Sequence, residues 1–233
     1  MNFCLTIFLA HALGDYYFQS NKMVADKKSN LFKHSVIYSM FLTLGYAFFD
    51  FTISALYFGF WLFVTHYIVD CIVIGINEKV SKNYELFVYI FDQFIHIMLI
   101  VIAVLIFGKA IETCPKTNMV LLYTTLVSYL IMPSSIFVEK IVSVVTKDEE
   151  PKKGFSLDEG SLIGILERLV VFMLGVVGNI GGIGLIIAAK TMVRYGQFND
   201  DKGAKNFQTK YLIGTLSSVL CGVVAYFIYQ SLF

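Results

Sequence analysis

The chain has 233 residues, of which 57% are hydrophobic and 15% charged, with a formal net charge of +1. Soluble domains contain about 45–50% apolar and about 25% charged residues, so this composition excludes a soluble domain, a disordered chain and a secreted disulfide scaffold. The near-zero net charge gives no reason to expect nucleic acid as a partner. We therefore expect an all-α, polytopic transmembrane helical bundle whose main partner is the lipid bilayer.

Apolar runs along the chain predict about eight transmembrane helices. They cover residues 2–19, 33–50, 52–76, 86–107, 119–145, 161–178, 181–195 and 211–232. As one helix, the stretch 161–195 would be about 52 Å long, whereas a hydrocarbon core is about 30 Å thick. Gly178, Gly181 and Gly182 interrupt this stretch and predict a tight turn between two short helices. A single broken element, giving seven crossings, is the alternative.

Basic residues predict the orientation of these helices. If the N-terminus is outside, nearly all loop lysines and arginines lie on the inner side, and Lys109 and Lys116 are the exceptions. This bias predicts both termini outside and a multi-pass protein of the inner (cytoplasmic) membrane. The whole chain, 1–233, is expected to form a single membrane domain. Its parts would be the His/Asp-bearing helices in 1–107, a connecting helix and cytosolic loop in 108–160, and a glycine-rich hairpin with the last helix in 161–233.

Histidine and aspartate occur in pairs inside three of the apolar segments. Each pair is spaced four residues apart: His11 with Asp15, His66 with Asp70, and Asp92 with His96. Residues four apart share a helix face, and the predicted topology places the three pairs at similar depth in the cytosolic half of the membrane. A charge in a bilayer costs about 2.5–3.5 kcal/mol on insertion scales, so it needs a partner or a function. Self-neutralising ion pairs between packed helices are the structural alternative.

Imidazole and carboxylate groups together suit a divalent metal, with zinc preferred and manganese or iron as alternatives. The expected metal ligands are His11, Asp15, His66, Asp70, Asp92 and His96. His34, at the start of the second long helix, is expected to be a further ligand or a proton shuttle, and Asp15 a proton acceptor. Gln93 is expected to hold a catalytic water or a substrate oxygen. Gln19 continues the face of His11 and Asp15 and is expected to contact the substrate.

A second polar set lies within 161–195. It consists of Glu167, Arg168, Lys190 and Arg194, all expected at the cytosolic level. Cationic donors beside a metal suit phosphate or carboxylate groups, so this set is expected to bind a small-molecule or lipid-linked anionic substrate. Snorkelling to lipid headgroups is the alternative for Arg194. An ion pair between Glu167 and Lys190 is the alternative for those two residues, and structural pairing is equally open for Arg168.

Several short motifs occur in a fixed order: A-H-A-L-G-D-Y-Y-F-Q, H-Y-I-V-D, F-D-Q-F-I-H, I-G-I-L-E-R and A-A-K-T-M-V-R-Y. Over residues 10–34, 66–96 and 163–195 the chain resembles a family of bacterial integral membrane proteins described as a domain of unknown function. The resemblance implies a bacterial inner-membrane protein and no particular activity. A looser likeness, to membrane-bound metal-dependent hydrolases, rests on His and Asp in early helices.

The polar residues favour a membrane-embedded, metal-dependent hydrolase whose phosphorylated or lipid-linked substrate is reached from the cytosolic side. A proton or metal-cation transporter that uses the same His/Asp residues is a second hypothesis. A non-catalytic membrane subunit or scaffold is the third. The oligomeric state is left open, a homo-oligomer included.

Overall fold

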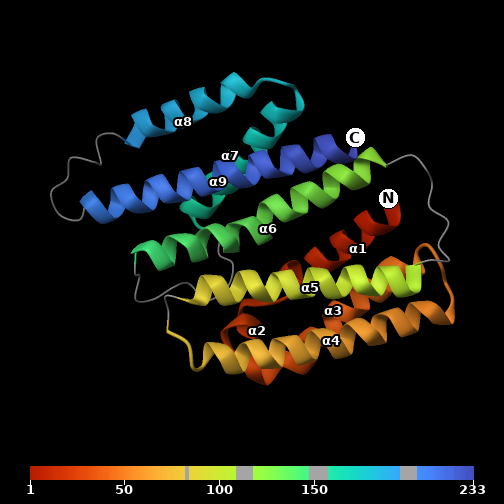
Figure 1. Ribbon diagram of the computed structural model, residues 1–233. Helices are drawn as coiled ribbons and strands as arrows, with labels where there is room; N and C mark the ends of the chain where they lie inside the picture. The colour runs from red at the N-terminus through yellow and green to blue at the C-terminus, as the bar shows by residue number, and fades with distance from the viewer. Residues whose placement is uncertain (82–83, 109–117, 147–156, 195–203) are drawn as a thin grey trace. The chain divides into compact units, whose positions relative to one another are not determined.

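The computed structural model describes residues 1–81, 84–108, 118–146, 157–194 and 204–233, without the side chains of 194 and 204–207. Every regular element in these residues is a helix, as Figure 1 shows. The all-α class predicted from the apolar runs is therefore confirmed.

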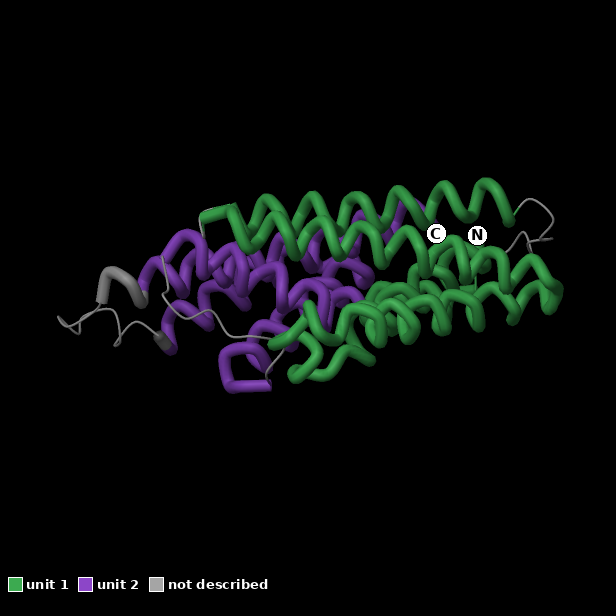
Figure 2. Tube along the Cα trace, turned by 90° about the horizontal axis from the view of Figure 1, so that it is seen from below, with its two compact units in different colours: residues 1–128 green, residues 129–233 purple. Residues whose placement is uncertain are grey.

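The chain divides into two compact units, Met1–Ser128 and Tyr129–Phe233, which Figure 2 colours separately. The first unit contains α1 (Asn2–Ala12), the π-helix η1 (Leu13–Tyr17), α2 (Asn21–Ala25), α3 (Lys27–Ala47), α4 (Ile53–Asn77), α5 (Glu85–Phe107) and the start of α6 (Met119–Thr146). The second contains the remainder of α6, α7 (Glu159–Val176), α8 (Ile180–Arg194) and α9 (Ala204–Leu232).

Four helices are long and apolar enough to cross a membrane. They are α4, α5, α6 and the part of α9 from Gln208 to Leu232. The other predicted spans fall short of this length and composition for identifiable reasons. α1 and α8 are short, α3 begins with several lysines, and α7 contains Glu159, Glu167 and Arg168. The four apolar helices identify a membrane protein.

The first predicted span differs from the structure in its second half. One helix was expected over 2–19, but α1 ends at Ala12 and η1 follows, with the backbone N–H of Phe18 bonded to the carbonyl of Leu13 at 2.9 Å. The chain then leaves the helix, and the hydroxyl of Ser20 caps α2. Gln19 therefore does not continue a helical face from Asp15. A π-helical turn of this kind is rare and is frequent at functional sites.

The second long helix begins six residues earlier than the predicted span. The carboxylate of Asp26 accepts a hydrogen bond from the backbone N–H of Ser29 at 3.2 Å and caps the start of α3. Asp is a preferred residue at this position because it satisfies an orphan backbone donor. The longer helix carries Lys27 in its first turn.

Helices α1, α3, α4 and α5 pack side by side in the first unit, with α3 against both α1 and α4 (Figure 1). Gly14 allows η1 to lie close to α3, because a Cβ there would be 2.9 Å from the Cα of Tyr38. Away from the α3 N-terminus, these helices enclose a buried apolar core that includes Phe3, Ile7 and Phe58. The packing thus holds one end of the unit together mainly through apolar contacts, with the hydroxyl of Tyr46 donating to the carbonyl of Phe107 at 2.7 Å.

A tight turn joins α7 and α8 in the second unit. Gly178 has a φ of +74°, a value that favours glycine, and α8 starts two residues later. The backbone N–H of Asn179 bonds to the carbonyl of Leu174 at 2.8 Å, which closes the turn. The predicted division of 161–195 into two helices is therefore confirmed.

Candidate metal centre

Four elements of the first unit bring acidic and imidazole side chains together. The cluster consists of Asp15 from η1, His34 from α3, His66 and Asp70 from α4, and Asp92 and His96 from α5. All six side chains are buried. Burial of this many titratable groups is costly unless they satisfy one another or bind an ion.

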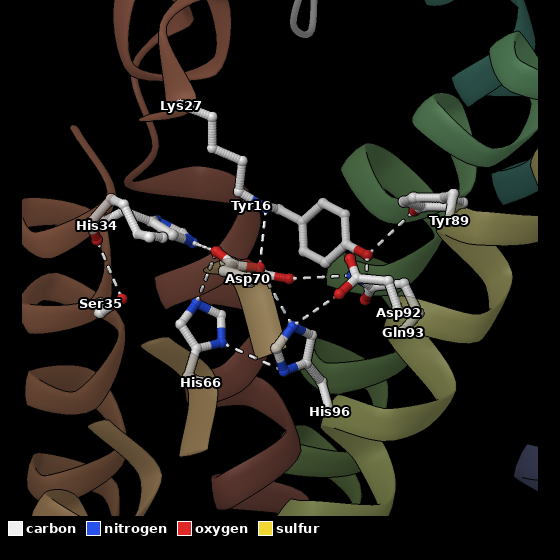
Figure 3. A network of polar contacts seen from close by, with 12 residues as sticks. Tyr16, Lys27, His34, Ser35, His66, Asp70, Tyr89, Asp92, Gln93 and His96 are labelled. Atoms are coloured by element: carbon white, nitrogen blue, oxygen red, sulfur yellow. Dashed lines mark hydrogen bonds and ion pairs between the residues drawn. The ribbon is translucent and has the colours of Figure 1, made fainter. Parts of the chain in front are cut away.

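Asp70 lies in the middle of the cluster, between His34, His66 and His96 (Figure 3). Its Oδ2 is 3.5 Å from Nε2 of His66 and 3.7 Å from Nε2 of His34, and its Oδ1 is 3.5 Å from Nε2 of His96. Nε2 of His34 is also 3.2 Å from Oδ1 of Asp15. Two sets of three residues could hold a metal ion: Asp15, His34 and His66, and His66, Asp70 and His96. His66 belongs to both sets.

The spacing of these atoms could accommodate a metal ion. With zinc to nitrogen or oxygen distances of about 2.0–2.1 Å and tetrahedral angles, neighbouring ligand atoms are about 3.3 Å apart. The distances from Asp70 to the three imidazoles, 3.5–3.7 Å, exceed the usual N–H···O range of about 2.7–3.2 Å. Nε2 of His66 and Oδ2 of Asp70 have no hydrogen-bond partner. Their lone pairs are available to a cation.

Asp92 and Gln93 form a layer behind these ligands. Oδ1 of Asp92 is 3.1 Å from Nε2 of His96, the i, i+4 pairing expected from the sequence. The side-chain amide of Gln93 donates to Oδ2 of Asp15 and to Oδ2 of Asp92, both at 3.4 Å. The amide that was expected to hold water or substrate thus links two carboxylates of the cluster.

Two tyrosines extend this layer. The hydroxyl of Tyr16 donates to Oε1 of Gln93 at 2.6 Å and lies 3.1 Å from the hydroxyl of Tyr89 (Figure 3). Because Tyr16 bonds to the oxygen of the amide, the NH₂ group must face the carboxylates. Hydrogen bonds of this type orient metal ligands and tune their affinity. The sequence reasoning missed both tyrosines, which lie one residue after Asp15 and three residues before Asp92.

Lys27 is a third contributor that the sequence reasoning missed. Its Nζ is 2.9 Å from Oδ1 of Asp70. The Lys27 side chain is 31% exposed and that of Asp70 is 1% exposed, so the cluster lies one side chain from the protein surface. Two features of the sequence could have indicated this position of Lys27. Asp26 is a helix-capping residue, so the helix can start at Lys27. Lys27 and His34 are seven residues apart, which places them on one face of the longer helix.

His11 is not brought into either set of candidate ligands. Its buried ring lies edge-on to the ring of Tyr38, with centroids 5.7 Å apart. The expectation assumed a regular α-helix from His11 to Asp15, whereas the π-helix η1 intervenes and changes the angle between the two side chains. Tyr38 also stacks on His66, at 3.8 Å between centroids and 13° between planes. This contact holds the His66 imidazole in one orientation.

The predicted substrate-binding residues on α7 and α8 belong to the second unit. Arg168 is buried, and its Nε donates to the carbonyl of Leu130 at 2.7 Å. Its Nη1 donates to the hydroxyl of Ser218 at 3.2 Å, and its Nη2 to the hydroxyl of Ser135. The guanidinium therefore connects α7 to α6 and α9. This is the structural role that was left open for Arg168 as the alternative to substrate binding.

Lys190 pairs with Glu167, with Nζ 2.7 Å from Oε2. This ion pair joins α8 to α7, and the ammonium also lies 5.5 Å from the ring centroid of Tyr211. The side chain of Arg194 lies outside the described residues. The described cations of the predicted set thus have partners within their own unit.

A family model described as a protein of unknown function, DUF3307, matches residues 3–124. The chain belongs to the DUF3307 family. No curated protein and no solved structure matches the chain.

The DUF3307 match covers nearly all of the first unit and every residue of the cluster, Lys27 and Gln93 included. The resemblance inferred from the sequence motifs is therefore confirmed for residues 10–34 and 66–96. The motifs in 163–195 lie outside the DUF3307 match. The candidate metal centre is thus contained within the part of the chain that defines the family.

Proposed function

We propose that this protein is a membrane-embedded, metal-dependent hydrolase. Its metal ligands are Asp15, His34, His66, Asp70 and His96, with Asp92 orienting His96. The observation that carries the proposal is the pair of three-residue sets that share His66, with unsatisfied lone pairs at the spacing of ligands. Zinc is the preferred metal, and manganese and iron are the alternatives.

A bound divalent metal supplies a Lewis acid and a nucleophile at neutral pH. The residues of the chain hold and orient the site. Gln93 fixes the carboxylates of Asp15 and Asp92, and Tyr38 fixes the ring of His66. Asp15 contacts His34 at 3.2 Å, so the two side chains are held together without movement of the backbone. Such preorganisation is what hydrolysis requires of a protein scaffold.

The surroundings of the cluster favour hydrolysis over transport. One side of the cluster reaches the surface through Lys27, which is partly exposed. Beyond the cluster, α1, α3 and α4 continue into the apolar core formed by residues such as Phe3, Ile7 and Phe58. A transport pathway would need polar groups along that direction. A site that lies near the surface on the side of Lys27 suits a substrate that enters and leaves on that side.

We further propose that the side of the cluster near Lys27 is cytosolic. The lysine-rich segment 22–33 contains Lys27, and Lys79 follows Glu78, which pairs with Lys28; positive charge marks the inner side of a membrane protein. This orientation requires eight crossings with both termini outside, which includes the helices that are short or charged. The substrate is a phosphorylated or lipid-linked molecule that reaches the inner face of the membrane.

Metal analysis of detergent-purified protein tests the proposal. Wild-type protein should contain at least about one equivalent of a divalent metal, and Asp70→Asn should lose it, because Asp70 contacts three imidazoles. Glu167→Gln is the matched control, since Glu167 is a buried carboxylate outside the cluster. Wild-type protein without metal after purification and zinc reconstitution would contradict the proposal.

Activity separates hydrolysis from transport. Zinc-loaded protein should release phosphate from a phosphomonoester or a lipid-linked diphosphate, and the Asp70→Asn variant should not. Metal and proton flux into proteoliposomes is measured on the same preparations. Flux without hydrolysis would replace the proposed hydrolase with a transporter.

A further inference from the structure

One oxygen of the proposed metal centre is already bonded to a cation from the chain itself. Nζ of Lys27 is 2.9 Å from Oδ1 of Asp70, the length of a charge-assisted hydrogen bond. The same Oδ1 is 3.5 Å from Nε2 of His96. The ammonium of Lys27 and the set formed by His66, Asp70 and His96 therefore meet at a single carboxylate.

A divalent metal on the unpartnered Oδ2 of Asp70 and the ammonium of Lys27 on Oδ1 would be only one carboxylate apart. They repel each other at such short range, and the repulsion is strong where water is largely excluded. The metal would lie among groups that are buried and fixed, whereas Lys27 has a flexible four-carbon stem and is about one-third exposed. The lysine is therefore the group that moves, because its ammonium can be solvated at the surface while its stem stays packed.

The displaced ammonium would remain at the surface beside the cluster. In the metal-free cluster the carboxylates of Asp15, Asp70 and Asp92 repel an anion. A divalent metal reverses the local charge, and the ammonium released from Asp70 adds a further positive charge at the rim. Lysine binds phosphate groups as a point charge without demanding a fixed geometry.

We propose that Lys27 is the anion-binding residue of this centre: a divalent metal on Asp70 displaces its ammonium, which then binds the phosphate-like group of the substrate. The inference rests on the proposed metal site and names its substrate class as a phosphorylated anion. It also orders the two binding events, since the metal must bind before the anion. Lys27 is thereby assigned the role that the sequence alone had given to cations of the second unit.

Neighbouring Lys28 provides a matched control. It pairs with Glu78 at 2.9 Å, but both side chains are more than half exposed. The hydrogen bond from Lys28 lowers the pKa of Glu78, as in an ordinary surface pair. The two lysines are adjacent in sequence and each has one carboxylate partner. Any change that is specific to Lys27 therefore reports on the cluster and not on lysines in general.

The first experiment needs no substitution. Lysines of the purified full-length protein are acylated with an amine-specific reagent, and the labelling of Lys27 relative to Lys28 is measured by peptide mass spectrometry. Zinc should raise this ratio about threefold or more, because the ion pair that shields the Lys27 amine is broken. Inorganic phosphate added after zinc should lower it again, and phosphate without zinc should not. A ratio that zinc leaves unchanged overturns the proposal.

The second experiment measures phosphate binding to zinc-loaded protein by equilibrium dialysis. Lys27→Met should weaken phosphate binding about tenfold or more, since hydrogen bonds to charged groups are worth more than neutral ones. Lys27→Arg should retain most of the binding, and Lys28→Met should match wild-type protein. Zinc affinity should not fall in Lys27→Met, because the substitution removes a competitor for Asp70. Equal phosphate affinity in Lys27→Met and Lys28→Met overturns the proposal.

The two proposals fail in different ways. If wild-type protein binds no zinc, the proposed metal centre is wrong and the role of Lys27 is wrong with it. Wild-type protein could instead bind zinc in an Asp70-dependent manner, with no effect of zinc on the labelling of Lys27 and no effect of Lys27→Met on phosphate binding. In that case the metal centre stands and only the role of Lys27 is overturned. Loss of zinc in Lys27→Met would also overturn that role, because it would make Lys27 a structural support of the site.

Discussion

The two units bury charged side chains in different ways. In the first, imidazoles and carboxylates face one another at 3.1–3.7 Å, and several of their nitrogen and oxygen atoms have no hydrogen-bond partner. In the second, three nitrogens of Arg168 each donate to a carbonyl or hydroxyl oxygen, and Lys190 pairs with Glu167. Burial of charge alone does not identify a site. The distinguishing feature is that the unpartnered atoms of the first unit converge in one cluster, whereas Arg168 and Lys190 of the second unit have partners, although Oε1 of Glu167 has none.

The largest expected effect comes from His66, because both sets of candidate ligands contain it. His66→Gln should lower zinc affinity by more than the about 10–100-fold that loss of a second-shell partner costs. His34→Gln and His96→Gln should each leave one set intact, with a smaller loss of affinity or of stoichiometry. Zinc titration of the purified variants measures these differences.

His11 sharpens this test because it is as deeply buried as His66. His11→Gln should retain wild-type zinc affinity, since His11 packs against Tyr38 and lies in neither set. Loss of zinc in His11→Gln, equal to the loss in His66→Gln, would show that the metal selects a different ligand set.

A substitution in the second unit should lower stability without changing zinc binding. Arg168→Met leaves the carbonyl of Leu130 and the hydroxyls of Ser135 and Ser218 without their donor, so we expect a loss of about 2–4 kcal/mol in unfolding free energy. Zinc content should stay at the wild-type level. Thermal unfolding in detergent and metal analysis of the same sample measure the two quantities. A stable variant that has lost zinc would contradict the structural role of Arg168.

The close packing of η1 against α3 predicts the next largest effect, a loss of stability in Gly14→Ala. Gly14→Ala places a Cβ 2.9 Å from the Cα of Tyr38, and backbone cannot yield as a side-chain end can. We expect a loss of about 1–3 kcal/mol in stability from overpacking, together with weaker zinc binding as Asp15 moves from His34. Gly75→Ala is the control, since its added Cβ meets open space. Equal stability of the two variants would show that η1 and α3 can separate without cost.

The sequence predicted those features that depend on composition and regular spacing. The i, i+4 pairs of α4 and α5 lie where a regular helix places them, and the glycines of the α7–α8 turn act as expected. The sequence did not predict η1, because a π-helical turn depends on the packing that a close contact such as Gly14 with Tyr38 permits. The prediction of His11 as a ligand assumed the regular helix that η1 replaces.

The roles of the cations could not be predicted from residue type. Arg168 and Lys190 have the chemistry of anion-binding residues, but the structure supplies each with partners in the second unit. Lys27 was interpreted only as a loop charge, and the cap at Asp26 that places it on α3 was overlooked. Which carboxylate a lysine reaches depends on how two helices pack, and neither helix encodes that distance alone.

The smallest effect that we expect to measure concerns the hydroxyl of Tyr16. Tyr16→Phe removes the donor that fixes Gln93, so the amide can turn and its NH₂ group no longer faces both carboxylates. Zinc affinity should fall about tenfold, the lower range for second-shell partners, with about 1 kcal/mol or less of lost stability. Tyr17→Phe is the control, because its hydroxyl bonds to the carbonyl of Ser128 and not to the cluster. If both variants bind zinc as wild-type protein does, the tyrosine layer stabilises the unit without tuning its metal ligands.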